Sequence, residues 1–430
     1  MRGLPSIACH RVLSGGRGAG ARDVPHTRFA DAPALKLSAV VNPVLTSHIM
    51  SIVQNVIRPE VLAMRSYPVA DATGMIKLDV MESPYGLPEW LAREVGDIVS
   101  RVQLNRYPVP SLERLRTLIA EKMGIPDGCD VLCGNGSDEC IQFITAACAR
   151  EGAVVMAPAP SFTMFQMHAL FYRLKFVSVS LNADFSLDAD TFIAAMHEHK
   201  PALVWIAYPN NPTGSPYSMA AVERIVRAAP GLVVIDEAYQ PFAADSFMPR
   251  LSEFTNMVVM RTVSKISLAG LRLGYVGGRP EWIAEFDKTR APYNIGVLAE
   301  AVAIKVLENK HVLDEQAARV LSERPVVQRG LAGMRGLTQF PSAANFVCVR
   351  IDGPPGAGTA IFSSMKRQKV LVKDFSGGHP LLANCLRLTI GSPDENRAML
   401  AALQVALSSE TSGRPMPPTG SGALAGTFKV

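Results

Sequence analysis

The sequence lacks the cysteine pairs that hold small secreted domains together. Its seven cysteines are an odd number, and no two of them form a Cys-x-x-Cys pair. Disulfide frameworks and structural zinc sites both depend on such pairing. We therefore expect free thiols, a reducing cytoplasmic location and no bound metal. His197 and His199 are the only closely spaced histidines, and the helix end expected there favours an ordinary surface over a metal site.

The sequence also lacks an excess of either charge. Lysine and arginine number 43 against 38 acidic residues, which gives a formal net charge of +5, and the two signs are interspersed along the chain. Nucleic acids and membrane surfaces are bound through concentrated basic patches, so neither partner is expected. Small anionic substrates are compatible with this weak positive balance.

No apolar run has the character of a membrane span. The stretch from Ala153 to Tyr172 has no charged residue and the length of a membrane span, but Pro158 and Pro160 interrupt it. A spanning helix needs roughly 20 consecutive apolar residues, and proline breaks helices. The stretch therefore predicts a strand, a loop and a helix. A Gly-x-Gly-x-x-Gly turn after the first strand is missing as well, which argues against a dinucleotide-binding protein.

What the chain does have is length and apolar content. Its 430 residues, 48% of them hydrophobic, are enough for two domains. Strand-like and helical patterns alternate from about 130 to 290, which predicts a parallel α/β layer. We predict an N-terminal extension over 1–49, an arm and part of a small domain over 50–95, a large domain over 96–320, a small C-terminal domain over 321–408 and a mobile tail over 409–430.

The first 49 residues differ in composition from the rest. They carry five arginines against two aspartates, with glycines between them. This composition predicts a disordered extension, or a start codon placed upstream of a working start at Met50. A transit peptide is the alternative.

Polar side chains follow two apolar runs that read as buried strands. Leu203–Tyr208 stops at a Pro-Asn-Asn-Pro-Thr-Gly turn that contains Asn211, and Leu232–Ile235 stops at Asp236, with Tyr239 three residues later. In open α/β sheets ligands bind at the carboxyl ends of the strands. Core strands with ordinary polar turns are the alternative interpretation of each run.

One lysine lies among hydroxyls, small residues and an arginine. Thr262, Ser264, Lys265 and Arg272 occur within a short segment. A lysine that bonds a carbonyl cofactor must be partly desolvated and near other positive charge, so that its neutral amine is available. The hydroxyls and the arginine can hold an anionic phosphate beside it. A cationic surface turn is the alternative.

A glycine turn precedes a helical pattern at Gly134–Glu139. It delivers Ser137 and Asp138 to the start of the helix, where backbone N–H groups and the helix dipole favour a phosphate. Such turns are also common as plain helix caps, so this signal alone leaves both interpretations open.

Together these segments resemble the fold-type I pyridoxal-phosphate aminotransferases, whose markers are an Asn-Pro-Thr-Gly turn, an Asp-x-Ala-Tyr strand end and a Ser-Lys followed by an arginine. The resemblance implies an α/β fold with a large, mostly parallel-sheet domain and a smaller α+β domain. It implies pyridoxal 5'-phosphate as cofactor, joined covalently to Lys265, which also moves a proton. Asp236 would pair with the pyridine nitrogen, and Asn211 and Tyr239 would hydrogen-bond the phenolic oxygen.

The resemblance also assigns the other cofactor contacts. Phe162 matches an aromatic that stacks on the ring, although a core phenylalanine is an equal alternative. The residues expected around the cofactor phosphate are Ser137, Asp138, Thr262, Ser264 and Arg272.

Within that group, the histidinol-phosphate aminotransferases are the nearest match, over roughly residues 56–405. The resemblance implies a homodimer in which Tyr67 reaches the partner's cofactor, while Tyr85 lines the substrate pocket. Arg387 matches the arginine that binds the carboxylate of glutamate. The phosphate of histidinol phosphate would use the same cationic pocket, with Tyr85 and Lys373 assisting. Two departures affect substrate choice: Ser83 replaces the usual asparagine, and Lys373 stands where some members have arginine.

The expected activity is amino transfer between glutamate and histidinol phosphate, with small molecules as the only substrates. An aromatic or broad-specificity aminotransferase, or a related decarboxylase, is the alternative within the same fold. A non-catalytic regulator is the alternative from another class, but it would be expected to lose Lys265 or Asp236, and both are present.

Overall fold

The computed structural model describes residues 51–64, 66, 69–109 and 111–411. The chain divides into two units, Met1–Tyr67 and Pro68–Val430. In the first unit, residues 51–56 and α2 (Pro59–Leu62) are helical. The predictions for 1–49, for Tyr67 and for 412–430 lie outside the described residues.

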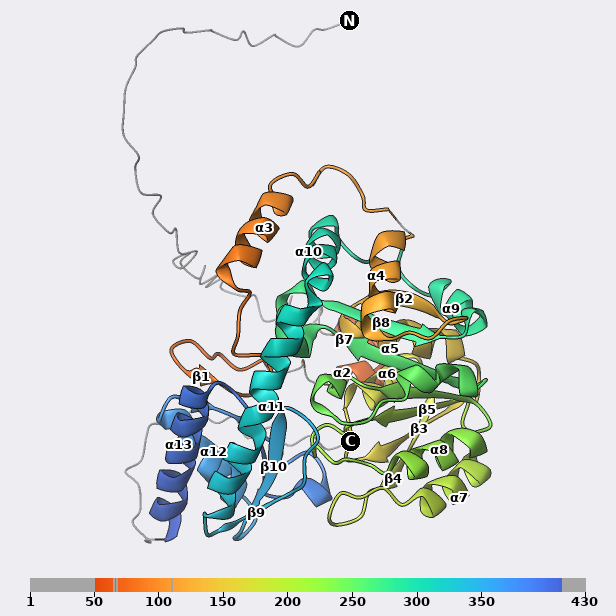
Figure 1. Ribbon diagram of the computed structural model, residues 1–430. Coiled ribbons are helices and arrows are strands. Elements are labelled where there is room, and N and C mark those ends of the chain that lie inside the picture. The colour runs from red at the N-terminus through yellow and green to blue at the C-terminus, as the bar shows by residue number, and fades with distance from the viewer. Residues whose placement is uncertain (1–50, 65, 67–68, 110, 412–430) are drawn as a thin grey trace, which may run out of the picture. The chain divides into compact units, whose positions relative to one another are not determined.

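The second unit is built on a seven-stranded sheet (Figure 1). In spatial order its strands are β2 (Asp130–Asn135), β8 (Leu273–Gly278), β7 (Met257–Thr262), β6 (Leu232–Asp236), β5 (Leu203–Ala207), β3 (Val154–Ala159) and β4 (Lys175–Ser180). The strands from β7 to β4 pair in parallel, and β8 pairs antiparallel with both of its neighbours. The predicted mostly parallel sheet is therefore present.

Both faces of the sheet are buried, as the unbroken apolar runs predict. In β5, Val204 and Ile206 belong to one core cluster, whereas Leu203 and Trp205 belong to another. Successive side chains of a strand point to opposite faces, so each central strand contributes to two cores. Phe165 stacks on Trp205 with ring centroids 4.8 Å apart. The helices of this part are α4 (Glu113–Met123), α5 (Gly136–Cys148), α6 (Met164–Phe171), α7 (Ala189–His199), α8 (Met219–Ala228) and α9 (Pro280–Asp287).

A smaller antiparallel sheet follows in the C-terminal part. Its order is β12 (Lys373–Asp374), β13 (Cys385–Thr389), β10 (Phe346–Ile351) and β9 (Leu337–Gln339). A separate parallel pair joins β1 (Ile76–Lys77) to β11 (Val370–Leu371), which brings the start of this unit beside its C-terminal part. The associated helices are α12 (Ala357–Arg367) and α13 (Pro393–Thr411).

Helix α11 (Lys310–Ala332) lies between the part built on the seven-stranded sheet and the C-terminal part with the small sheet (Figure 1). It crosses the predicted domain boundary at residue 320, and α13 continues three residues beyond the predicted end of the small domain at 408. The domain boundaries themselves stay predictions.

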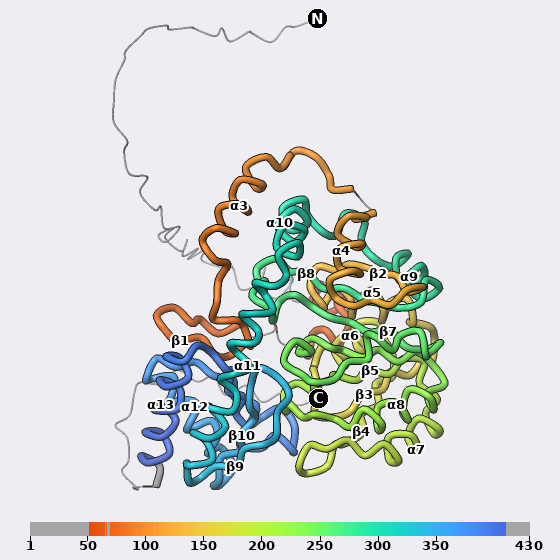
Figure 2. Tube along the Cα trace, viewed as in Figure 1, coloured from red at the N-terminus to blue at the C-terminus, as the bar shows by residue number. Residues whose placement is uncertain are grey.

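Asn309 separates two consecutive helices. Helix α10 (Val297–Glu308) ends at Glu308, and α11 begins at Lys310. The Asn309 side chain donates to the Lys305 carbonyl at 3.0 Å, and such local bonds compete with the helical pattern. Helix α3 (Glu89–Val99) lies beside α10 although the two are far apart in sequence (Figure 2).

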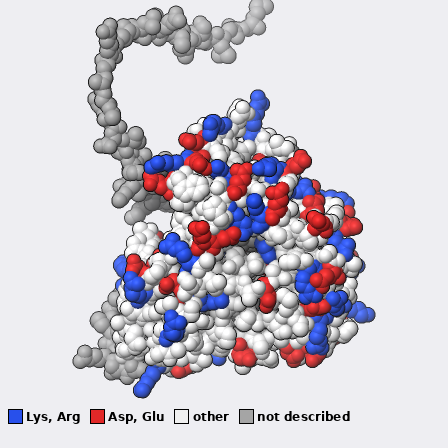
Figure 3. Space-filling model, viewed as in Figure 1, with Lys and Arg blue, Asp and Glu red and all other residues white. Residues whose placement is uncertain are grey.

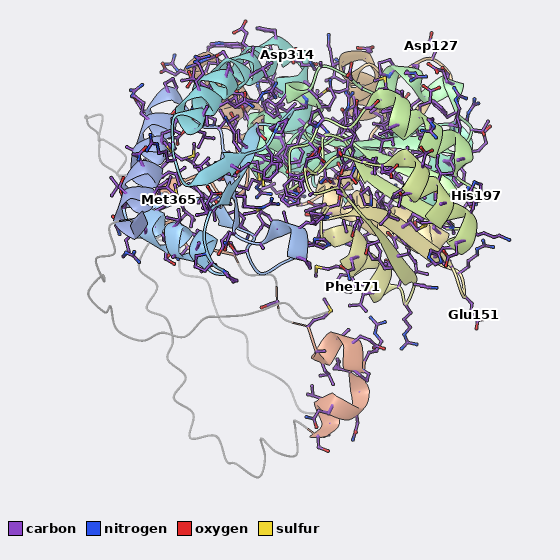
Figure 4. All side chains as sticks on the ribbon, turned by 90° about the horizontal axis from the view of Figure 1, so that it is seen from below. Asp127, Glu151, Phe171, His197, Asp314 and Met365 are labelled. Carbon is purple, nitrogen blue, oxygen red and sulfur yellow. The ribbon has the colours of Figure 1, made fainter. Side chains whose placement is uncertain are left out.

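The described surface carries no concentration of one charge on the face shown in Figure 3, where basic and acidic side chains are interspersed. Within the described ranges, no helix is both long and apolar enough to cross a membrane. Cys129, Cys133, Cys140, Cys148, Cys348 and Cys385 are free thiols. His197 lies at the periphery (Figure 4), and the described residues contain no cluster of three or more metal-ligating side chains.

Candidate active site

The candidate site lies at the carboxyl ends of the central strands. Asp236 is the last residue of β6 and Thr262 the last of β7, while Asn211 follows β5. Ala207 at the end of β5 is paired with Asp236, and Asp236 is paired with Met260. Because parallel strands end at a common edge, residues distant in sequence converge there.

The turn that presents Asn211 is fixed by the asparagine before it. The Asn210 side chain is fully buried and donates to the Pro160 carbonyl at 3.0 Å and to the Thr213 hydroxyl at 2.8 Å. Its oxygen accepts from the Ser161 hydroxyl at 2.8 Å. With two bonds to the Pro160–Ser161 loop and one within its own turn, Asn210 holds the turn, and Asn211 is among the residues that line the site.

A cavity that is partly open to solvent occupies this edge. Ten of its fourteen lining residues were expected from the sequence: Ser137, Asp138, Phe162, Asn211, Asp236, Tyr239, Thr262, Ser264, Lys265 and Arg272. The other four are Met81, Ala207, Pro209 and Ala238.

Lys265 lies in a short helical turn, Ser264–Leu268, directly after β7. Its Nζ donates to the Val80 carbonyl at 2.9 Å and lies 5.8 Å from the centroid of the Tyr239 ring. The amine therefore faces the cavity between a backbone acceptor and an aromatic face.

The electrostatic surroundings favour the neutral amine of this lysine. Burial, and then the positive charges of Arg387 and Arg272, lower the pKa of Lys265 to about 8, against the opposing influence of Glu82 and Asp138. A larger share of neutral amine near neutral pH makes the side chain a better nucleophile toward a carbonyl carbon.

Asp236 lies deep in the cavity, with 5% of its surface exposed. Burial, together with the charges of Asp138 and Glu237, raises the pKa of Asp236 to about 7, although the Ala238 N–H donates to its carboxylate at 3.0 Å. A cationic partner would stabilise the ionised form of this carboxylate. The protonated ring nitrogen of a pyridine cofactor is such a partner.

The opposite end of the cavity suits a phosphate. Helix α5 begins at Gly136, so its first-turn N–H groups and the Ser137 hydroxyl belong to a helix N-terminus. The Arg272 guanidinium lies 3.2 Å from Asp138. A Cβ built at Gly136, whose φ is +77°, would stand 2.5 Å from Arg272. The hydroxyls of Thr262 and Ser264 lie 2.9 Å apart beside them. These donors fit a bound phosphate group.

A second cation lies next to the cavity but does not line it. Arg387 has 4% of its surface exposed, and its two terminal nitrogens donate to the Asn211 side chain at 2.6 Å and to the Asp79 carbonyl at 2.7 Å. Lys373 is its partner across the sheet, and burial, followed by the charge of Arg387, lowers the pKa of Lys373. The two cations are therefore paired on adjacent strands, and Arg387 contacts Asn211.

Not every predicted residue is brought to the cavity. Tyr85, Lys373 and Arg387 lie outside its lining, and Tyr67 is not described. The Tyr85 ring is covered by the Arg319 guanidinium, 3.8 Å from its centroid. Sequence reasoning missed Arg319 because an arginine on the exposed side of a long helix carries no motif.

The comparison with known proteins settles the family. Residues 73–403 match the family described as Aminotransferase class I and II. The chain belongs to this family. Its members depend on pyridoxal phosphate, and the sequence prediction of a pyridoxal-phosphate-dependent aminotransferase is confirmed.

Curated relatives match this aminotransferase over almost their whole length. Histidinol-phosphate aminotransferase 1 of Burkholderia lata is 54% identical over 359 residues, covering 83% of this chain and 99% of the relative. Histidinol-phosphate aminotransferase 2 of Cupriavidus pinatubonensis is 52% identical over 362 residues, covering 83% and 98%.

Solved structures share the fold. A histidinol-phosphate aminotransferase from Sinorhizobium meliloti, in complex with pyridoxal-5'-phosphate, has a TM-score of 0.74 and 24% identity, covering 82% of this chain and 98% of its own. One from Clostridium acetobutylicum has a TM-score of 0.71 and 21% identity, covering 77% and 99%. The predicted fold-type I class is confirmed.

Proposed function

We propose that this aminotransferase moves an amino group between glutamate or 2-oxoglutarate and histidinol phosphate or imidazole acetol phosphate, a step of histidine biosynthesis. The observation that carries the proposal is the identity of about half of all aligned residues with the histidinol-phosphate aminotransferases of Burkholderia and Cupriavidus. The geometry is consistent with it, because a lysine, a buried acid and a buried arginine converge at one edge of the sheet.

The residues of the cavity fit pyridoxal 5'-phosphate. Lys265 would bond its carbonyl carbon, Asp236 would face its ring nitrogen, and Asn211 and Tyr239 would hydrogen-bond its phenolic oxygen. Phe162 lines the cavity, in position to cover the ring. The phosphate contacts would be Ser137, Asp138, Thr262, Ser264 and Arg272. When bound, this cofactor supplies an electron sink for the bond that breaks at the substrate's α-carbon.

The chain's own groups orient the substrate and move the proton. Lys265 Nζ would accept the proton from the substrate's α-carbon and pass it to the cofactor carbon on the other side of the amino nitrogen. The Arg387 guanidinium matches a carboxylate or a phosphate bidentately, so it would accept glutamate and histidinol phosphate in turn. Lys373 and Tyr85 would add donors for the phosphate.

We also propose a cytoplasmic homodimer, with Tyr67 reaching the partner's cofactor. Large apolar side chains are exposed on the second unit, including Leu104 at 71% and Tyr107 at 80%. Tyr107 stacks on Tyr293, also exposed, with centroids 4.7 Å apart. Contiguous exposed apolar surface is characteristic of protein interfaces.

Substitution of Gly274 tests the proposed phosphate-binding end of the cavity. In Gly274→Ala the new Cβ would stand 2.5 Å from the Ser137 nitrogen and 2.6 Å from the Gly136 carbonyl carbon, both backbone atoms. The first turn of α5 must then shift, and we expect affinity for pyridoxal 5'-phosphate, measured by absorbance titration, to fall by about tenfold or more. Gly270→Ala is the matched control, because its Cβ would meet nothing within 4 Å. Equal affinities in the two variants would contradict this assignment of the phosphate site.

The substrate assignment is tested by measuring turnover of two different amino acceptors. The purified protein is expected to convert imidazole acetol phosphate with glutamate as donor, at a kcat/KM at least about 100-fold above that for phenylpyruvate, because only the former carries a phosphate for the cationic pocket. A higher kcat/KM for phenylpyruvate would contradict the proposal and would indicate an aromatic aminotransferase. Release of carbon dioxide without amino transfer would indicate a decarboxylase.

A further inference from the structure

Three consecutive carbonyls beside the site are each held by a side chain from elsewhere. Regular strand pairing after β1 ends at Leu78, whose N–H donates to the Leu371 carbonyl at 2.8 Å. The next carbonyls accept from Arg387 Nη2 at Asp79 (2.7 Å), from Lys265 Nζ at Val80 (2.9 Å) and from Asn345 Nδ2 at Met81 (3.1 Å). Two of the donors are the proposed cofactor lysine and substrate arginine, and the third has no assigned role.

Asn345 directly precedes β10 of the small sheet and is almost completely buried, with 1% of its surface exposed. Its own carbonyl accepts from the Ile390 N–H at 2.8 Å, three residues beyond Arg387. Its side-chain oxygen has no hydrogen-bond partner among the described residues. Burying an amide with an unused acceptor is unfavourable, so the bond made by its nitrogen is the feature that needs explaining.

The residue that receives this bond has an uncommon backbone conformation. Met81 has a φ of +57°, in the left-handed region that side chains other than glycine and asparagine rarely adopt. Such a conformation persists where surrounding contacts over-determine it. The Asn345 amide is the contact on the Met81 carbonyl, and the orientation of the preceding carbonyl, that of Val80, depends on the same turn.

We propose that Asn345 is a positioning residue that holds the 79–81 backbone so that its carbonyls face Lys265 and Arg387. The inference rests on the proposed function and deepens it. A carbonyl that accepts from Nζ favours the protonated lysine. The Val80 carbonyl therefore helps the amine to hold the proton that it moves during the reaction, and one backbone segment sets the resting places of both the lysine and the arginine.

Loss of the Asn345 amide is expected to lower the pKa of Lys265. The turn at Met81 relaxes in Asn345→Ala and the Val80 carbonyl no longer accepts from Nζ, while the neighbouring charges are unchanged. The charged and titratable groups that face Lys265 are Glu82, Asp138, Asp236, Tyr239, Arg272 and Arg387. We expect a fall of about one pKa unit from the loss of one hydrogen bond to the charged form.

The experiment measures that pKa in the full chain freed of cofactor. Acetic anhydride labels neutral amines, and peptide mapping of Lys265 over a range of pH gives its titration. Asn256→Ala is the matched control, because the Asn256 side chain also bonds backbone carbonyls, of Val226 at 3.1 Å and of Gly231 at 3.2 Å, but lies before the start of β7, at the opposite edge of the sheet. A lower Lys265 pKa in Asn345→Ala alone supports the proposal, and equal values in both variants overturn it.

The loaded enzyme gives a second readout. In Asn345→Ala the single-turnover conversion of the cofactor by glutamate is expected to slow by about tenfold, with its pH profile displaced to lower pH and KM changed less than kcat. A rise in KM alone would mean a merely structural role and would overturn the proposal. Should Asn345→Ala not fold, Asn345→Ser, which is too short to reach Met81, takes its place with the same expectations.

Failure of the proposed function is distinguishable from failure of this inference. If the unaltered protein does not react with glutamate, the assignment as an aminotransferase of this substrate pair fails. The comparison of Lys265 pKa values in the cofactor-free chains still decides the role of Asn345.

Discussion

Replacing Lys265 by alanine is expected to lower kcat/KM with glutamate by more than about 10⁴-fold, the largest effect of any single substitution in the chain. In the proposed assignment Lys265 makes two contributions that are lost together, as the nucleophile that bonds the cofactor and as the base that moves the substrate's proton. Both depend on the burial and the neighbouring positive charge that lower the pKa of Lys265 to about 8. The measurement is steady-state turnover, with reductive trapping by borohydride and peptide mapping of the labelled lysine.

The comparison variant for this prediction is Lys305→Ala. Lys305 pairs with Glu94 at 2.6 Å and is not among the residues that line the cavity. Removing it is expected to leave both turnover and borohydride labelling unchanged, since exposed ion pairs contribute little to stability. Small primary amines added to Lys265→Ala are expected to restore part of the proton transfer. Labelling at another lysine in the unaltered protein would refute the assignment.

The strands that carry the site could be predicted because their physical signal is local. The runs Leu203–Ala207 and Leu232–Ile235 are apolar on both faces, which is what a central parallel strand requires. Once two such strands are recognised, the rule that their carboxyl ends share an edge brings Asn211 and Asp236 together without any knowledge of the fold's details. The same argument places the segment after β7, with Lys265, at that edge.

Contacts made by backbone atoms could not be predicted. Val80 and Met81 contribute backbone carbonyls to the site region. Every residue has a backbone carbonyl, so the sequence does not distinguish these two. Their roles follow from a left-handed turn at Met81, which is not a residue type that indicates such a turn. The bond of Asn345 could not be predicted either, because its partner lies 264 positions away in the sequence.

Helix ends were harder to predict than helix faces. Serine is a favoured capping residue, yet Ser111 does not cap α4: the helix begins at Glu113, and Leu112 precedes it with a φ of +47°. The apolar spacing of Leu115 and Leu118 was sufficient to identify the buried face. Caps depend on the approach of the preceding loop, which spacing does not encode.

Asp236→Asn is expected to lower kcat by about 10²–10³-fold while substrate KM changes little. The asparagine keeps the shape of the side chain and the bond from the Ala238 N–H, but it cannot supply a negative charge opposite a protonated ring nitrogen. Preorganised charge at such a position is typically worth this much in rate. Asp236→Glu is expected to recover less than full activity, because the buried site leaves little room for an added methylene.

Glu237, the carboxylate next to Asp236, provides a comparison between an acid that acts in the reaction and one that only stabilises the fold. Glu237 is also buried, but it points away from the cavity lining and binds Arg261 at 2.8 Å. Glu237→Gln is expected to lower the free energy of unfolding by about 3 kcal/mol, as the loss of one partner of a buried pair does, while kcat of the folded protein is retained. Thermal denaturation and turnover measured on both variants distinguish the two roles. Glu237→Gln could instead lose turnover to the same extent as Asp236→Asn. The reaction would then require negative charge at this strand end in general, and the specific placement of Asp236 would not matter.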